Sequence, residues 1–232
     1  MADSQTHSLR KIELYSDLSD RELAEVEKQC SWKRFAAQEQ IIDRHSETRD
    51  VYFIVNGRVR VVNYSLSGRE VTLDDFLAGS PFGELAAIDG EPRSASVMAL
   101  EPTLLASLSH EHFVRTMQQY PRAAMRLMRH LTRMVRASTD RIMDLSTLGA
   151  NNRVHAELLR QARDSMDGEN TAVIRPIPVH GDMASRVSTT RETVARVMND
   201  LARKGIVERR KDALVILDLQ ELMAMVEDVR GE

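Results

Sequence analysis

The segment from Pro121 to Gly149 constrains the fold more than any other part of the sequence. No Gly or Pro lies between these two residues, and Pro is well suited to the first turn of a helix. The segment therefore predicts a single helix of roughly 40 Å, at 1.5 Å per residue. Six of its residues alternate at spacings of three and four, as in the seam of a coiled coil: Met128, Leu131, Val135, Ser138, Ile142 and Leu145.

This seam has two interpretations. An amphipathic helix that packs against its own domain shows the same stripe, and about three heptads are the minimum for a coiled coil. However, Ser138 in the middle of an apolar interface costs stability and needs a reason. We therefore favour a functional seam that contacts a second helix, with packing inside one domain as the alternative.

The composition narrows the class of protein. The chain has 232 residues, a net charge of −3 and 42% hydrophobic residues, which predicts a globular protein of about two domains. Its single cysteine, Cys30, excludes a disulfide framework, a zinc site made only of cysteines and a cysteine-ligated iron–sulfur cluster. No apolar run approaches the ~20 residues that cross a bilayer, and the N-terminus lacks the pattern of a signal peptide. We therefore expect a cytoplasmic protein with no membrane partner.

The N-terminal half predicts a small β-domain. Ser19 and Glu22 form a capping-box pattern, so a short helix is expected to about Gln29. Residues 41–108 contain short β-branched runs separated by turn residues, which is typical of an antiparallel sandwich or barrel. Asn56-Gly57 lies between two of these runs and predicts a hairpin.

The C-terminal part predicts a winged helix-turn-helix. Helices are expected at residues 180–186 and 191–204, on either side of the polar residues 188–190. The second helix is expected to end before Gly205, as helices commonly do. A β-hairpin is expected at residues 207–217.

The second of these helices is expected to face DNA. Residues 186–211 contain eight basic and three acidic side chains, and such a concentration of positive charge suits DNA phosphates. A solvated charged face is the alternative, and Thr189 with Glu192 also reads as a capping box. At 100° per residue the polar residues lie opposite the apolar ones: Arg191, Glu192, Arg196 and Asn199 on one face, and Val194, Val197, Met198 and Leu201 on the other.

Two short motifs form a candidate anion site. They are Phe82-Gly-Glu-Leu85 and Pro92-Arg-Ser-Ala95. A Gly lets the backbone approach a ligand, helix N–H groups and an Arg suit a phosphate, and a carboxylate suits a ribose hydroxyl. The alternative is that Arg93 is a solvated charge on a surface loop.

These residues resemble a known family. The two short motifs are similar to the phosphate-binding cassette of cyclic-nucleotide-binding domains, and residues 191–196 are similar to the recognition helix of bacterial cyclic-AMP receptor and fumarate–nitrate regulators. The resemblance covers about residues 14–217 and implies an α+β fold in four parts. These are an antiparallel β-roll or jelly-roll cyclic-nucleotide-binding domain at 14–120, a dimerisation helix at 121–147, a hinge at 148–152 and a winged helix-turn-helix DNA-binding domain at 153–232.

The resemblance implies a role for each residue of the ligand site. Glu84 would accept from the ribose 2′-hydroxyl, while Arg93 and Ser94 would bind the cyclic phosphate. Ser138 and Thr139 would contact the purine from the long helices of both subunits. The implied ligand-binding residues are Val61, Leu73, Gly83, Glu84, Leu85, Arg93, Ser94, Ala95, Ser138 and Thr139.

The resemblance also implies a DNA site. Arg pairs with guanine and Glu accepts from cytosine, so Arg191, Glu192 and Arg196 would read TGTGA-like half-sites in an inverted repeat of double-stranded DNA. RNA polymerase is a further expected partner. The residues implied to contact phosphates are Thr190, Thr193, Arg210 and Lys211.

The chain departs from the family pattern in its ligand site. Met134 stands where the relatives carry an Arg, and the cassette is one residue shorter between Glu84 and Arg93. Cyclic AMP is the expected effector. Cyclic GMP is an alternative, because Ser94 could reach a guanine amino group. A regulator with a different ligand, or one with a vestigial cassette, is a further alternative.

Other functional classes fit the sequence less well. A haem site is not expected, because His110 and His112 are two residues apart and would not share a helix face. No catalytic constellation or clustered metal ligands are found in the sequence, so neither an enzyme nor a metal site is expected. Two alternatives remain. The chain could be the nucleotide-sensing regulatory subunit of an enzyme, or it could itself hydrolyse the nucleotide.

Overall fold

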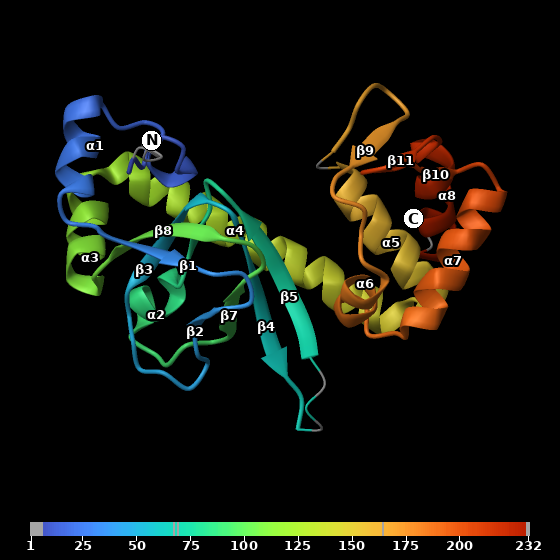
Figure 1. Cartoon of the computed structure of the whole chain (residues 1–232), viewed down its shortest axis with the longest axis horizontal. Coiled ribbons are helices and arrows are strands. Elements are labelled where there is room, and N and C mark those ends of the chain that lie inside the picture. The colour runs from blue at the N-terminus through green and yellow to red at the C-terminus, as the bar shows by residue number, and fades with distance from the viewer. Residues whose placement is uncertain (1–6, 67, 69, 164, 231–232) are drawn as a thin grey trace. The chain divides into compact units, whose positions relative to one another are not determined.

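The structure is a computed structural model that describes residues 7–66, 68, 70–163 and 165–230. The first six residues, where the signal-peptide pattern is lacking, lie outside this part of the chain. Two compact units are present, residues 1–134 and residues 135–232, and each is described by itself. Helix α4 (Pro121–Thr147) begins in the first unit and ends in the second (Figure 1).

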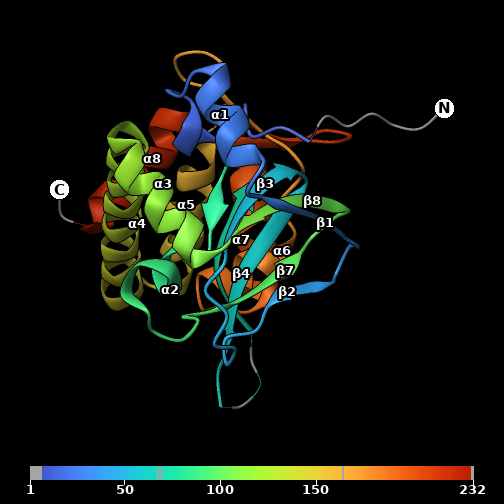
Figure 2. The ribbon, with the colours of Figure 1, turned by 90° about the vertical axis from the view of Figure 1, so that its left-hand side faces the viewer.

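The first unit is built on two antiparallel sheets of four strands each. Their strand orders are β1-β8-β3-β6 and β2-β7-β4-β5, as predicted for an antiparallel β-domain. Figure 2 shows this unit with α1, α2 and α3 beside the strands. The strands are β1 (Ser31–Phe35), β2 (Gln40–Ile42), β3 (Val51–Asn56), β4 (Arg58–Tyr64), β5 (Glu70–Leu77), β6 (Pro81–Phe82), β7 (Ser96–Ala99) and β8 (Thr103–Leu108).

In the described part of this unit, three α-helices and one 3-10 turn accompany the sheets. The predicted capping box is confirmed, since Ser19 Oγ accepts from the Glu22 N–H and the Glu22 carboxylate accepts from the Ser19 N–H. The helix that it starts ends at Glu27, two residues before the predicted end. The elements are η1 (Glu13–Tyr15), α1 (Asp20–Glu27), α2 (Glu84–Asp89) and α3 (His110–Gln119).

The predicted hairpin at Asn56-Gly57 is wrong. Strands β3 and β4, on either side of it, belong to different sheets, and β4 pairs with β5 and β7 instead. Gly57 has a φ of +96°, and a Cβ there would lie 2.8 Å from Thr103 Cα. The glycine is therefore needed where the chain crosses from one sheet to the other against the start of β8.

The second unit contains the predicted winged helix-turn-helix. Helix α6 has the predicted bounds, α7 ends one residue earlier than predicted, and β10 with β11 forms the predicted hairpin. Strand β9 and helix α8 were not predicted. The elements are α5 (Ala150–Arg163), β9 (Ala172–Ile174), α6 (His180–Arg186), α7 (Arg191–Arg203), β10 (Val207–Arg209), β11 (Leu214–Ile216) and α8 (Leu219–Arg230).

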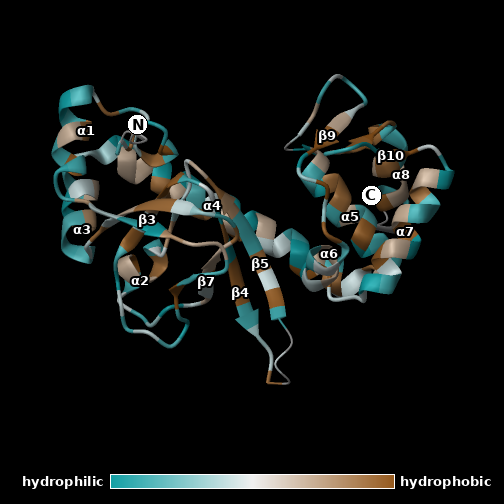
Figure 3. Ribbon diagram, in the orientation of Figure 1, coloured by the Kyte–Doolittle hydropathy of each residue, from teal (hydrophilic) through white to brown (hydrophobic). Residues whose placement is uncertain are grey.

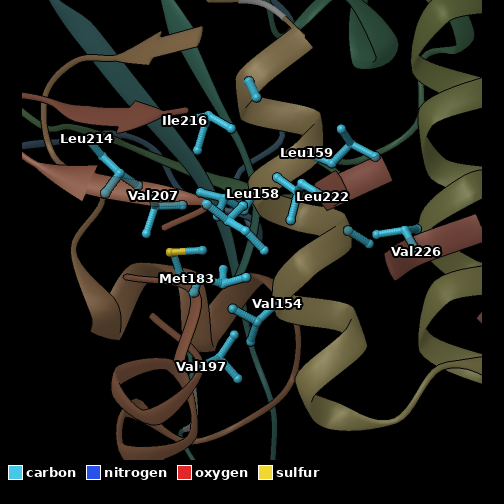
Figure 4. Close-up of a cluster of buried hydrophobic side chains, with 14 of the residues drawn as sticks. Val154, Leu158, Leu159, Met183, Val197, Val207, Leu214, Ile216, Leu222 and Val226 are labelled. Atoms are coloured by element: carbon cyan, nitrogen blue, oxygen red, sulfur yellow. The ribbon is translucent and has the colours of Figure 1, made fainter. Parts of the chain in front are cut away.

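One hydrophobic core holds the second unit together. Leu158 from α5, Val197 from α7 and Ile216 from β11 are all buried in it, and Figure 4 shows them converging with Leu222 from α8. Figure 3 shows both hydrophilic and hydrophobic residues along α7, as expected for a helix that buries one face. The recognition helix is thus fixed by its apolar face, as its periodicity predicted.

Helix α4 has the predicted bounds of residues 121–147. Only Leu148 and Gly149 separate it from α5, which begins at Ala150. The predicted linker at residues 148–152 is therefore helical from Ala150 on, and the break between the two helices is shorter than expected.

Candidate functional site

The first candidate site lies where β6 enters α2. Gly83 precedes the helix with a φ of +80°, a left-handed conformation that favours glycine. A Cβ on Gly83 would lie 2.7 Å from Nη1 of Arg93. The glycine therefore allows the guanidinium to approach the first turn of α2.

Arg93 is buried, with 4% of its surface exposed, so its interpretation as a solvated charge is wrong. Its Nη1 donates to Gly83 O at 2.8 Å, Nη2 to Asp50 O at 2.8 Å, and Nε to Thr48 Oγ1 at 3.2 Å. Burial lowers the pKa of Arg93, but an Arg side chain stays charged in proteins. A guanidinium has five N–H groups, so two remain for a ligand after these three bonds.

Glu84 is buried as the first residue of α2, with 3% of its surface exposed. Burial raises the pKa of its carboxyl, while its own backbone N–H and the charge of Arg93 lower it. Two opposite charges are therefore held close together inside the unit. Buried ionisable groups beside an opposite charge are often found at functional sites.

The rest of the predicted ligand site comes from neighbouring segments. Ser94 is exposed, and its carbonyl accepts from Asn63 Nδ2 of β4 at 3.3 Å. Val61 and Leu73 are half-buried on the paired strands β4 and β5. Leu73 sits where the register of this pair shifts, between the partners of Val61 and Val62. This hydrogen bond links the Pro92–Ala95 motif to strand β4, which carries Val61, one of the two residues predicted to contact the base.

The other predicted ligand residues have ordinary environments. Leu85 is 37% exposed and Ala95 is buried. Ser138 and Thr139 lie in the second unit, where both are exposed on α4 and Thr139 Oγ1 donates to Val135 O. The structure therefore brings together Gly83, Glu84 and Arg93, while the contact of Ser138 and Thr139 with a nucleotide stays a prediction.

The seam of α4 is largely exposed in the single chain. Val135 is 65% exposed and Ile142 is 62% exposed, whereas Leu131 is half-buried against the core of the first unit. Packing within one domain accounts for Leu131 but not for the later seam residues. An apolar stripe of this kind indicates an interaction surface.

The second candidate site is the helix-turn-helix. Arg191, Glu192 and Arg196 are exposed on α7, as its periodicity predicted. The N-cap is Thr190, whose side chain accepts from the Thr193 N–H at 3.2 Å, so the predicted capping box at Thr189 is wrong. A backbone hydrogen bond of Glu192 and the Thr190 hydroxyl lower the pKa of the Glu192 carboxyl, which keeps it an ionised acceptor.

The wing presents basic side chains beyond its two strands. Arg210 N–H donates to Ala213 O at 2.8 Å and closes the turn. The Arg210 side chain pairs with Glu208, and Lys211 is exposed. Both are accessible to a phosphate backbone, which would have to compete with Glu208 for Arg210.

Sequence reasoning missed three residues that hold these sites. Thr48 and Asp50 fix the Arg93 guanidinium, and Arg153 of α5 donates to the turn between α6 and α7. The contacts to Asp50 and from Arg153 use backbone carbonyls far away in the sequence, which leave no residue pattern.

Comparison with known proteins matches the two segments of the chain that carry these candidate sites. The family "Cyclic nucleotide-binding domain" matches residues 32–120, and "Crp-like helix-turn-helix domain" matches residues 152–225. The cyclic AMP receptor protein of Thermus thermophilus is 34% identical over 157 residues, which cover 68% of this chain and 70% of that protein. Transcriptional regulator LdrP of the same species is 30% identical over 82% of this chain and 94% of its own length.

The chain belongs to the CRP/FNR family. It is therefore a cyclic-nucleotide-binding, DNA-binding transcription regulator, and the family is one of regulators that act as dimers rather than one of enzymes. The fold agrees, since a CooA mutant from Carboxydothermus hydrogenoformans, at 22% identity, has a TM-score of 0.80 over 93% of this chain and 95% of its own. The predicted fold class and family resemblance are confirmed.

The described residues offer neither a metal site nor a membrane-spanning helix. Within that part of the chain, no group of three or more His, Cys, Asp and Glu side chains could hold a metal ion. Among the same residues, no helix is long and apolar enough to cross a membrane.

Proposed function

We propose that the chain is a cyclic-AMP-dependent regulator whose dimer binds an inverted repeat of TGTGA-like half-sites. The observation that carries the proposal is the buried pair of Glu84 and Arg93 beside Gly83, with two guanidinium N–H groups left over. Burying two charged groups costs free energy, because both lose their hydration. A cyclic phosphate and a ribose hydroxyl would satisfy both of them.

Each group of the nucleotide has a proposed partner. The two spare N–H groups of Arg93 would bind the phosphate, helped by the exposed Ser94 hydroxyl and by the backbone at Gly83 and Ala95. A bidentate bond of this kind is among the stronger ones in proteins. Glu84 would accept from the 2′-hydroxyl, Val61 and Leu73 would wall the base, and Leu85 would border the site.

The seam supports a dimer through residues 121–147. Val135 and Ile142 are mostly exposed in one chain, and a second copy of α4 would bury them. Ser138 lies between them in the seam, so that together with Thr139 it would contact the purine from both subunits. A nucleotide held in this way would prefer one arrangement of the two helices, and only such a preference shifts a conformational equilibrium.

The helix-turn-helix supports the DNA part of the proposal. Arg191 and Arg196 would pair with guanine and Glu192 with cytosine, which together ask for G·C pairs at defined positions of each half-site. A two-fold dimer requires an inverted repeat. The phosphates would be held by Thr190, Thr193, Arg210 and Lys211, with the break at Leu148 and Gly149 as the hinge. Such a regulator would act in the cytoplasm, with RNA polymerase as a further partner.

Cyclic GMP is the second candidate effector. The exposed Ser94 hydroxyl is available to a guanine amino group, and Met134 stands where the relatives would supply an Arg. Titration of the full chain with each nucleotide by calorimetry decides between the two. A lower dissociation constant for cyclic GMP would replace cyclic AMP in the proposal.

DNA binding tests the whole proposal. Fluorescence anisotropy of a duplex with a TGTGA inverted repeat is measured with cyclic AMP, with cyclic GMP and with neither. We expect tighter binding with cyclic AMP, and no such effect on a duplex with scrambled half-sites. Equal affinity in all three conditions would show that the cassette does not control DNA binding.

A further inference from the structure

Arg153 of helix α5 joins two parts of the second unit. Its Nη1 donates to Leu148 O at 3.0 Å, in the break after α4. Its Nε donates to Val187 O at 2.8 Å and its Nη2 to Ser188 O at 3.0 Å, both at the end of α6. One rigid guanidinium therefore holds the end of the seam helix and the turn before the recognition helix at the same time.

A second arginine on the same face of α5 repeats this connection. Arg160 lies seven residues after Arg153, which is two turns of helix. It donates to Asp144 Oδ2 of α4 at 2.9 Å and also to the carboxylate of Glu157. Glu157 in turn lies 3.7 Å from Nη1 of Arg186, the last residue of α6.

The carboxylates of this network are more deeply buried than its arginines. Asp144 is 4% exposed and Glu157 is 1% exposed. Gln161 Nε2 also donates to Glu157 Oε1 at 2.9 Å. A buried ion pair is weak evidence for stability, because desolvation offsets most of the attraction. Its value lies in fixing one geometry, since a displaced partner leaves a charge buried and unpaired.

We propose that Arg153 and the pair of Asp144 and Arg160 are positioning residues for DNA recognition. Through them, the position of the last turn of α4 sets the position of α6 and of the turn that precedes α7. This inference rests on the proposed function in one respect, because the nucleotide is the signal that would move α4.

The geometry explains why arginine is used. Its three bonded nitrogens point in fixed directions, so a shift of Leu148 either carries the carbonyls of Val187 and Ser188 with it or breaks bonds. Ser188 has a φ of +50°, a conformation that a non-glycine residue keeps only when its surroundings hold it. Lysine offers a single point charge on a flexible stem, and could not hold all three carbonyls in one arrangement.

The test compares three variants of the full chain with a matched control. Arg153→Met removes the fork, Arg153→Lys keeps only the charge, and Asp144→Asn weakens the second connection without emptying the site. The control is Arg163→Met, because Arg163 is exposed on the same helix and its side chain makes no hydrogen bond to another described residue. Thermal unfolding establishes that each protein is folded.

The readout is the ratio of DNA affinities with and without cyclic AMP, measured on the TGTGA inverted repeat. We expect the ratio to fall by roughly 5- to 20-fold in the three variants, which is in the range of known allosteric couplings, and to be unchanged in Arg163→Met. Cyclic AMP binding to the DNA-free protein should be unaffected. A purely structural role would instead lower both DNA affinities alike and leave the ratio intact.

The two ways of failing are distinct. If folded Arg153→Met has the same ratio of DNA affinities as a wild-type protein that responds to cyclic AMP, this inference alone is overturned. If cyclic AMP does not change DNA binding by the wild-type protein, the proposed function is overturned. The DNA affinities of the variants then test whether Arg153 positions the recognition helix. In that case Arg153→Met must bind the inverted repeat more weakly than Arg163→Met, and equal affinities would reject the role as well.

Discussion

Replacing Arg93 by alanine tests the ligand site and its structural support together. The guanidinium donates three hydrogen bonds within the first unit, and a bond from a charged group contributes about 1.5–3 kcal/mol. Burial of the cation, which lowers the pKa of Arg93, offsets part of this gain. We therefore expect Arg93→Ala to reduce the free energy of unfolding of this unit by about 2–4 kcal/mol.

The same change should weaken nucleotide binding. Two further charge-assisted bonds to the phosphate would contribute about 3 kcal/mol, so the affinity should fall by about 100-fold. At a cyclic AMP concentration of about 100 times the wild-type dissociation constant, the ligand stabilises the wild-type protein by about 2.7 kcal/mol. At that concentration the variant would gain only about 0.4 kcal/mol.

Urea unfolding followed by tryptophan fluorescence measures both effects. Trp32 is the only tryptophan of the chain and lies in β1, so its signal reports on the first unit alone. The control is Arg49→Ala, since Arg49 is an exposed arginine near Gly90 of the same cassette. A folded Arg93→Ala protein that keeps the full stabilisation by cyclic AMP would show that the nucleotide binds elsewhere.

Four further predictions concern the candidate sites. Burial raises the pKa of the Glu84 carboxyl, so the stabilisation that the protonated carboxyl gives is present at low pH and is lost as the pH rises through the raised pKa. Glu84→Gln should remove this dependence of the unfolding free energy on pH, measured by urea unfolding across the acid range. An unchanged dependence would contradict the prediction. Ser138→Ala should weaken the coupling between cyclic AMP and DNA by about 1–3 kcal/mol, and an unaltered anisotropy ratio would reject this route. Arg196→Ala should cost roughly 1–3 kcal/mol of DNA binding and relax the preference at one G·C pair, while Lys211→Ala should lower the salt slope by about one for all sequences; site selection and salt titration check the two.

Local signals in the sequence predicted the elements that local physics determines. Helix α4 has the predicted bounds because a proline starts it and because no glycine or proline interrupts it before Gly149. The helices α3 and α8 were missed, although a capping residue precedes each of them in the sequence. Ser109 caps α3 by accepting from the His112 N–H, and Asp218 accepts from the Glu221 N–H at the start of α8.

The Asn56-Gly57 error has a different origin. A two-residue turn signal describes the backbone at the turn, but the pairing of the strands on either side depends on distant partners. Strand β3 pairs with β8 and β6, and β4 pairs with β7 and β5. Gly57 does have the positive φ that such a turn signal favours, and the wrong inference concerned which strands it joins.

The burial of Arg93 was equally beyond the reach of the sequence, and it changes how the site works. A solvated arginine would lose side-chain freedom when it bound a phosphate, and that entropy would reduce the affinity. In this structure the carbonyls of Asp50 and Gly83 already fix the guanidinium, so this loss belongs to folding and not to binding. Gly83 permits the close approach of the arginine that we propose as the phosphate ligand. A side chain at residue 83 would therefore displace the guanidinium, and we expect it to weaken nucleotide binding through that displacement.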